Sequence, residues 1–238
     1  MQMIKAVFFD LDGTLLPLDE NKFLELYFKL ICRRMAPKGY EPEQLVKVIW
    51  EGTKRMYQND GSKTNETVFW ETFLEFYGKD KCLDKEYLDA FYSEEFLQTK
   101  AACAPNPLAK EIIAFCNNNK LITVLSTNPI FPAIGTQNRM GFVDLKPTDF
   151  ALFTAYENSC YCKPNPKYFI ALLNKFNLKP EEVIVFGNNT YEDGECALAC
   201  GIKCYLVGDY IINHPKATHV FEHLNMDEVI SVIQKHMQ

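Results

Sequence analysis

Four short, largely apolar runs, each followed by polar or turn-forming residues, constrain the fold of this chain more than any other feature. The first is Ala6–Phe9, and the others span residues 121–125, 183–186 and 203–207. Such runs lack the polar alternation of a half-exposed strand. They are typical of strands that are buried on both faces, as in a parallel sheet.

Segments with helical spacing precede each of the last three runs, and one more follows the fourth run. They span 108–115, 168–176 and 193–200, and a closing segment carries Met226, Val229, Ile230 and Ile233. Regular alternation of strand and helix predicts a parallel α/β sheet.

A long helical stretch separates the first strand from the other three. From about Asp19 to Thr99, apolar side chains recur three and four residues apart, as at Phe23, Leu26 and Tyr27. Connections in compact domains usually have roughly 4–6 residues, so this stretch is interpreted as a domain of its own. We predict a doubly wound, Rossmann-like parallel sheet built from residues 1–17 and 105–238, with an all-helical cap at 18–104.

The cap sequence gives little information about a ligand. Its basic residues can face a cleft or simply solvate a helix, and the second reading is favoured for Arg33, Arg34, Lys54 and Arg55. Trp50 and Trp70 are interpreted as cap core rather than as a platform for stacking.

Four polar clusters follow strand ends or begin a helix, where ligands bind in open α/β sheets. In the first, Asp10 and Asp12 follow the first strand. Asp10 can attack a phosphorus atom, and Asp12 can protonate the leaving alcohol. An Asp/Gly turn without chemistry is an equally good reading of these residues alone.

The other clusters are weaker when each is taken alone. Hydroxyl and amide groups at Ser126, Thr127 and Asn128 can donate to phosphate or cap a helix. Lys163, between a cysteine and a proline, can be a fixed cation or a surface lysine. The segment 187–193 offers oxygen ligands that suit Mg²⁺, or it caps the next helix.

Taken in order, the clusters read DLDGT, VLSTN, CKPNP and GNNTYED, and in this the chain resembles the haloacid dehalogenase superfamily. The resemblance implies Asp10 as nucleophile and metal ligand, Asp12 as general acid and base, and Lys163 as the cationic partner. It also implies that Thr127 and Asn128 hold the phosphate, with Ser126 as the alternative. Mg²⁺ would be bound by Asp10, Asp12 (through its backbone carbonyl), Asn188 and Asp193.

One position departs from the family pattern. Asn188 stands where the family usually has an acid, so this ligand brings no charge. We expect Mg²⁺ affinity to be weaker by roughly 10–100-fold, by analogy with losses around metal sites. Asp193, or Glu192 beside it, could compensate.

The resemblance implies an Mg²⁺-dependent phosphohydrolase that acts on a small phosphorylated metabolite, and Asp12 argues against dehalogenation. The alternatives are a phosphomutase and a phosphate-binding protein with low turnover. The net charge of −6 argues against nucleic-acid binding. Nine cysteines without a CxxC pair, and no long apolar run, predict a cytoplasmic protein that does not enter a membrane. The sequence indicates no oligomeric state.

Overall fold

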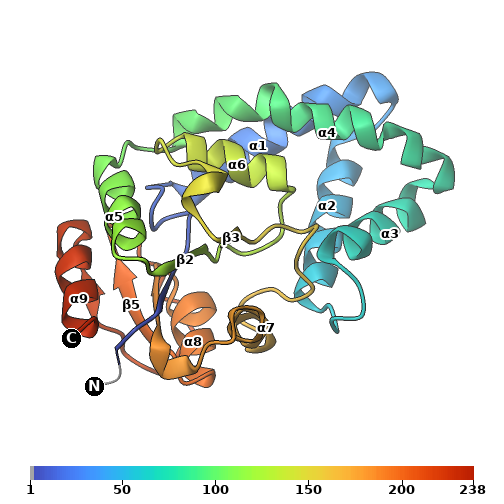
Figure 1. Cartoon of the computed structure of the whole chain (residues 1–238). Coiled ribbons are helices and arrows are strands. Elements are labelled where there is room, and N and C mark those ends of the chain that lie inside the picture. Colours follow the sequence, from blue (N-terminus) through green and yellow to red (C-terminus); the bar gives the residue numbers. More distant parts are fainter. Residues whose placement is uncertain (1–2) are drawn as a thin grey trace.

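The sheet has the predicted parallel architecture. The computed structural model describes residues 3–238, and its six strands form one sheet with the order β3-β2-β1-β4-β5-β6. Figure 1 shows the sheet with helices packed around it and labels β2, β3 and β5. All pairs of neighbouring strands are parallel. The strands are β1 (Ala6–Phe9), β2 (Ile122–Leu125), β3 (Leu152–Phe153), β4 (Val183–Gly187), β5 (Lys203–Val207) and β6 (His223–Leu224).

The four predicted strands are confirmed as β1, β2, β4 and β5. The structure adds β3 and β6 at the two edges of the sheet, each with two residues. Two residues are too few to produce a recognisable apolar pattern, so these edge strands were not predictable from periodicity.

Helices cover both faces of the sheet, which explains why the strand sequences do not alternate. In β1, Val7 and Phe9 belong to a hydrophobic cluster that also contains residues of α5 (Pro107–Asn118) and α9 (Val229–His236). Ala6 and Phe8 belong to a second cluster with α7 (Lys167–Phe176) and α8 (Cys196–Ala199). Successive side chains of a strand point to opposite faces, and here both faces are core.

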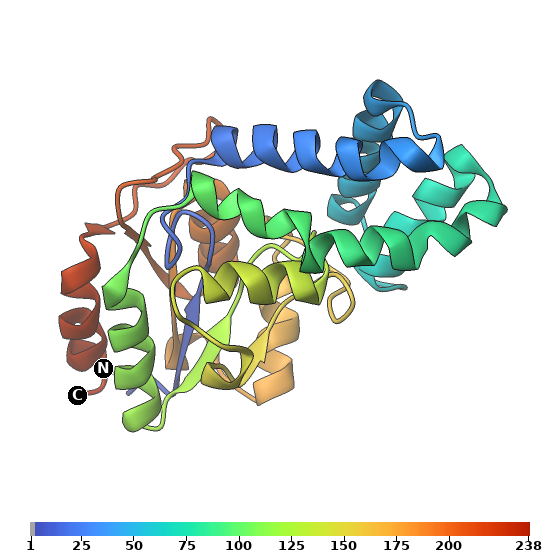
Figure 2. The same cartoon turned by 90° about the horizontal axis from the view of Figure 1, so that it is seen from above.

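The segment between β1 and β2 begins with the predicted helical cap. Its helices are α1 (Glu20–Met35), α2 (Pro42–Tyr57), α3 (Asn65–Tyr77) and α4 (Lys85–Ser93). The Asp19 side chain accepts from the amide of Lys22 at the start of α1, and Thr64 caps α3 in the same way. Figure 2 shows the cap extending away from the sheet.

The chain enters and leaves the cap at one place. Leu18 and Cys103 form an antiparallel bridge. The amide of Asp19 donates to the carbonyl of Ala102 (3.1 Å), and the amide of Ala104 donates to Pro17 (2.9 Å). The two linking segments therefore lie side by side at the junction between cap and core.

Two helical features differ from prediction. Helix α6 (Ala133–Gly141) was not predicted, because its sequence contains two glycines, which disfavour helix, and few large apolar residues. The helix predicted at 193–200 begins instead as a π-helical turn at Thr190–Glu195, and α8 follows it. The turn starts early because the Asn189 side chain accepts from the amides of Tyr191 and Glu192.

Short 3₁₀ turns complete the fold, at Ala36–Lys38, Lys79–Asp84, Glu95–Ala102, Pro147–Asp149, Pro180–Glu182 and Met226–Glu228. Across residues 3–238, none of the helices combines the length and the apolar character needed to cross a bilayer.

Candidate active site

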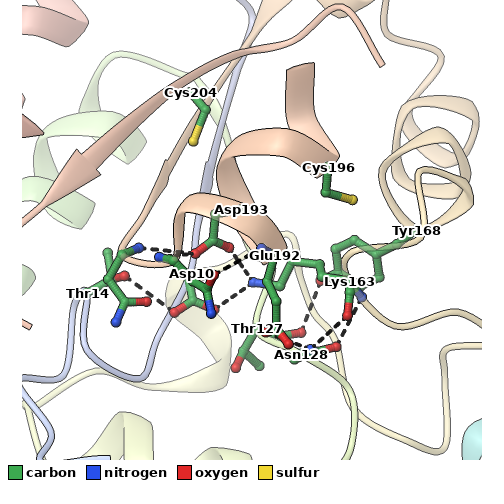
Figure 3. A network of polar contacts seen from close by, with 12 residues as sticks. Asp10, Thr14, Thr127, Asn128, Lys163, Tyr168, Glu192, Asp193, Cys196 and Cys204 are labelled. Carbon is green, nitrogen blue, oxygen red and sulfur yellow. Dashed lines mark hydrogen bonds and ion pairs between the residues drawn. The ribbon is translucent and has the colours of Figure 1, made fainter. Parts of the chain in front are cut away.

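Three of the predicted clusters meet because the strands that carry them are neighbours. Strand β1 lies between β2 and β4, and Phe9 pairs with Leu125 on one side and Phe186 on the other. The amide of Asp10 donates to Phe186 (2.8 Å), and the amide of Ser126 donates to Phe9 (2.7 Å). The residues that follow these strands therefore share the carboxyl edge of the sheet (Figure 3).

Lys163 joins this edge from the loop between β3 and α7. Its Nζ lies 2.8 Å from Oδ1 of Asp10 and 2.6 Å from Oδ1 of Asp193. The side chain is only 1% exposed, so the alternative reading as a solvated surface lysine is wrong. The sequence predicted a lysine at the site, and in the structure this lysine forms ion pairs with two carboxylates.

The side chain of Asn128 holds the backbone of Lys163. The Oδ1 atom accepts from the Lys163 amide, and Nδ2 donates to the Lys163 carbonyl, both at 3.1 Å. Nδ2 also donates to Oε2 of Glu192 (2.9 Å). Asn128 is therefore engaged in positioning the lysine, and its role as a phosphate ligand stays a prediction.

Burial and neighbouring charges set the ionisation of this cluster. Burial raises the pKa of Asp10 to about 7; Lys163 opposes the rise, and repulsion from Asp193 adds to it. Burial alone would lower the pKa of Lys163, but the two carboxylates outweigh it and hold that pKa well above its usual range. The lysine is therefore a permanent cation.

Asp193 is the most heavily engaged of the predicted metal ligands. Its Oδ1 accepts from Lys163, and its Oδ2 accepts from the amides of Asn188 (3.1 Å) and Asn189 (3.0 Å). It shapes the loop after β4 as well as facing the site.

Glu192, the neighbour of Asp193, reaches toward the cap instead. Its Oε1 accepts from the hydroxyl of Tyr57 in α2 (2.9 Å). Burial raises the pKa of Glu192. Glu192 thus links core and cap.

Asn188 lies against the loop of the first cluster. Its Nδ2 donates to the carbonyl of Tyr210 (2.7 Å), which leaves its Oδ1 as the unengaged polar atom of the side chain. A Cβ at Gly13 would lie 2.0 Å from that Nδ2, and Gly13 has a φ of +82°. Only glycine satisfies both conditions, so the contact brings the amide beside the Asp10–Thr14 turn.

Arg139 is the site residue that sequence reasoning missed. Its side chain is 2% exposed and forms an ion pair with Oδ2 of Asp12. The guanidinium also donates to Thr136 and to the carbonyl of Gly135, each at 3.3 Å, and lies 4.4 Å from the ring centre of Phe131. A single arginine in the unrecognised helix α6 carries no sequence motif that could have revealed it.

The structure separates the two hydroxyl candidates. Thr127 lines the cavity described below. The Oγ of Ser126 is buried, has no hydrogen-bond partner in the described chain, and does not line the cavity. The geometry therefore favours Thr127 over Ser126 for contact with a ligand.

A cavity of about 700 Å³ lies between the carboxyl edge of the sheet and the cap. All the predicted site residues line it, namely Asp10, Asp12, Thr127, Asn128, Lys163, Asn188 and Asp193. Cap residues from α1, α2, α3 and α4 line the rest. The predicted residues therefore share one space that is large enough for a small organic ligand.

The donors available for a metal are all oxygens, which suits a hard cation. Within residues 3–238, no three Asp, Glu, His or Cys side chains gather as a ready metal cluster. A cation would need the carboxylates of Asp10 and Asp193, the free amide oxygen of Asn188 and waters. The core side of the lining nevertheless favours a divalent cation. Four carboxyl groups there (Asp10, Asp12, Glu192, Asp193) face two cations (Lys163, Arg139), so the acids outnumber the cations by two.

Comparison with known proteins agrees with this geometry. A family model described as haloacid dehalogenase-like hydrolase matches residues 4–201. The chain therefore belongs to the haloacid dehalogenase-like hydrolases. A search of curated protein sequences found no significant match.

Solved structures share the fold at low identity. A 2-haloacid dehalogenase from Pseudomonas syringae is 20% identical with a TM-score of 0.63, covering 98% of this chain and 99% of its own. CbbY from Rhodobacter sphaeroides, solved in complex with phosphate, is 17% identical (TM-score 0.58, coverage 97% and 96%). A phosphatase of the same superfamily from Thermococcus onnurineus is 14% identical (TM-score 0.58, coverage 97% and 98%). Because the identities are low and the proteins include both a dehalogenase and a phosphatase, this likeness defines the fold but not the reaction.

Proposed function

We propose that the protein is a phosphohydrolase that releases phosphate from a small phosphomonoester through an aspartyl-phosphate. The observation that carries the proposal is the buried carboxylate of Asp10, which lies 2.8 Å from the Lys163 ammonium in the same cavity as Asp12. A nucleophile, a fixed cation and a second carboxylate are the groups that phosphoryl transfer from an alcohol requires.

The reaction takes two balanced steps. An oxygen of Asp10 attacks phosphorus, the ester P–O bond breaks, and Asp12 gives its proton to the leaving alkoxide. A water molecule then attacks the phosphorus of the aspartyl-phosphate, Asp12 accepts a proton from that water, and the acyl P–O bond breaks to release inorganic phosphate. Lys163 and Thr127 hold the phosphoryl oxygens throughout.

Mg²⁺ is the proposed cofactor. A phosphate dianion entering the site would meet an excess of negative charge, so a divalent cation is needed for both charge balance and binding. Asp10, Asn188, Asp193 and the backbone carbonyl of Asp12 would hold the ion. When bound, Mg²⁺ neutralises phosphate charge and orients the phosphoryl group for in-line attack.

Arg139 is proposed to position Asp12. Its ion pair with Oδ2 fixes that oxygen, while Oδ1 of Asp12 has no partner among the described residues. The free oxygen is thereby left to exchange a proton with the leaving group and with water.

The test is hydrolysis of p-nitrophenyl phosphate with Mg²⁺ and with EDTA, for the wild type and for Asp10→Asn. We expect turnover in wild type with Mg²⁺, and a loss of roughly 10⁴-fold or more in the variant. Beryllofluoride, a mimic of the aspartyl-phosphate, should raise the melting temperature of wild type but not of Asp10→Asn. Thermal protection without turnover would support a phosphate-binding protein, and full activity of Asp10→Asn would refute the proposal.

A further inference from the structure

The cap side of the cavity is a wall of apolar side chains. We define the aromatic wall as the lining residues Leu24 and Phe28 of α1, Ile49 and Trp50 of α2, and Phe69 and Trp70 of α3. Trp70 packs against the main hydrophobic cluster, as predicted. Trp50 was expected in the cap core and is instead 48% exposed, with its ring 5.4 Å from Phe28. Because the Trp50 side chain is half exposed and lines the cavity, it faces the cavity rather than the helix bundle.

Three hydroxyl groups near the aromatic wall already have hydrogen-bond partners. The hydroxyls of Tyr27 and Tyr92 bond to each other (3.1 Å), and the hydroxyl of Thr53 donates to the carbonyl of Ile49 (2.9 Å). A sugar carries several hydroxyl groups, and few partners are left for them here beyond the indole N–H of Trp50 and the side-chain amide of Asn21. Burial of unpaired polar groups is costly, so the wall disfavours a polyol.

The wall also offers no free cation. In the part of the chain that the structure describes, the lysine and arginine residues of the lining are Lys163 and Arg139, and both pair with carboxylates. The four basic cap residues discussed in the sequence analysis do not line the cavity, which agrees with their interpretation as residues that solvate a helix. They are Arg33, Arg34, Lys54 and Arg55. A second phosphate or a carboxylate on the substrate would therefore enter the cap side without a partner.

The acids on the cap side are mostly neutralised as well. Asp19 pairs with Lys22, and Asp89 pairs with Lys85. Glu20 is exposed at the start of α1. The wall is thus mainly apolar, and attraction to a cationic group would come chiefly from the faces of its aromatic rings.

We infer that the substrate is a phosphomonoester whose organic group is apolar and carries no further negative charge, such as an alkyl or aryl phosphate. The inference rests on the proposed hydrolase function and specifies its substrate class. The phosphate lies at the carboxyl edge of the sheet, and the organic group covers the aromatic wall, removing apolar surface from water. Sugar phosphates and bisphosphates are disfavoured for the separate reasons given above, and phosphocholine tests whether the aromatic rings select a cation instead.

The first experiment compares phosphate release from four esters of primary alcohols, so that leaving-group reactivity is similar. These are n-hexyl phosphate, glucose 6-phosphate, fructose 1,6-bisphosphate and phosphocholine. We expect kcat/KM for hexyl phosphate to exceed the others by at least about 10-fold, the effect typical of apolar group recognition. If any of the other three is the better substrate while p-nitrophenyl phosphate is hydrolysed, the substrate inference fails and the hydrolase function survives.

Matched variants test the wall itself. Trp50→Ala should reduce the preference for hexyl phosphate over glucose 6-phosphate, chiefly through KM. Phe76→Ala is the control, because Phe76 lies on α3, is 43% exposed and does not line the cavity. A preference that is the same in Trp50→Ala as in wild type would overturn the assignment.

A binding measurement keeps the inference testable if turnover is absent. Calorimetric titration with hexylphosphonate and methylphosphonate, which cannot be hydrolysed, should show hexylphosphonate binding at least about 10-fold more tightly. Equal affinities for the two phosphonates would refute the aromatic wall as a binding surface, independently of whether the protein is a hydrolase.

Discussion

The two sides of the cavity are built in opposite ways. On the core side, Lys163 and its two carboxylates are buried and bound to one another at 2.6–2.8 Å. On the cap side, rings such as Trp50 are partly open to the cavity and make few polar contacts. A site that combines them can keep its chemistry on the rigid sheet edge while the cap sets which organic group is accepted.

The largest effect should follow from removing the central cation. Lys163→Met leaves Asp10 and Asp193 buried without a counter-charge, so we expect the free energy of unfolding to fall by about 3–5 kcal/mol and activity to be lost. Urea denaturation measures the first and phosphate release the second. Lys167→Met, at an exposed lysine on α7, is the control. Equal stability of the two variants would show that the core side is not organised by Lys163.

Arg139 tests whether the core side acts on proton transfer. Because the alkoxide of hexanol needs a proton and p-nitrophenolate does not, Arg139→Gln should slow hexyl phosphate hydrolysis by about 10²-fold and p-nitrophenyl phosphate hydrolysis much less. Arg139→Lys, which keeps the charge, should recover part of the difference. An equal loss with both substrates would indicate a purely structural role.

Asn188 provides a further test of the core side, because it is a proposed ligand of Mg²⁺. Asn188→Asp adds a charged ligand, so the Mg²⁺ concentration for half-maximal activity should fall by about 10-fold. The same change removes the hydrogen bond to Tyr210, so stability in EDTA should fall by about 1–2 kcal/mol.

Asn189→Asp is the matched control for position 188, because its side chain only accepts hydrogen bonds and a carboxylate preserves them. An unchanged Mg²⁺ requirement in Asn188→Asp would count against this residue as a ligand.

The smallest effect concerns the contact between the two sides. Tyr57→Phe removes the hydrogen bond from α2 to Glu192 and the one that the hydroxyl accepts from Asn128 (3.1 Å), and we expect a stability loss of about 1 kcal/mol and a KM raised a few-fold. Tyr87→Phe removes a hydrogen bond within the cap, where the hydroxyl donates to the carbonyl of Arg34 (3.0 Å). If both variants have the same KM, Tyr57 does not connect the cap to the site.

The sequence predicted the core side far better than the cap side. Asp10, Asn188 and the residues around Thr127 follow apolar strands, and parallel strands bring their carboxyl ends together by geometry alone. Lys163 and Asp193 have the order and spacing of a family motif. These positions are therefore readable without tertiary information.

The remaining features depend on packing that no local pattern encodes. Trp50 and Ile49 are adjacent in an amphipathic helix and both line the cavity, and only the placement of α2 decides that Ile49 is buried while Trp50 is half exposed. Arg139 reaches Asp12 across 127 residues of sequence from a helix with weak helical propensity. The engagement of Asn128 with the Lys163 backbone is likewise a product of the fold.

The pairing of Leu18 with Cys103 has a consequence for how such proteins diversify. Because the chain leaves the sheet and returns to it at neighbouring points, the stretch between them resembles an inserted module whose ends are already joined. The sheet meets only that short joint, so an insert of another length or shape can be accommodated there without shifting β1 against β2. Substrate choice can then evolve by exchange of the module while the carboxyl edge of the sheet, where we propose that phosphoryl transfer takes place, is inherited unchanged.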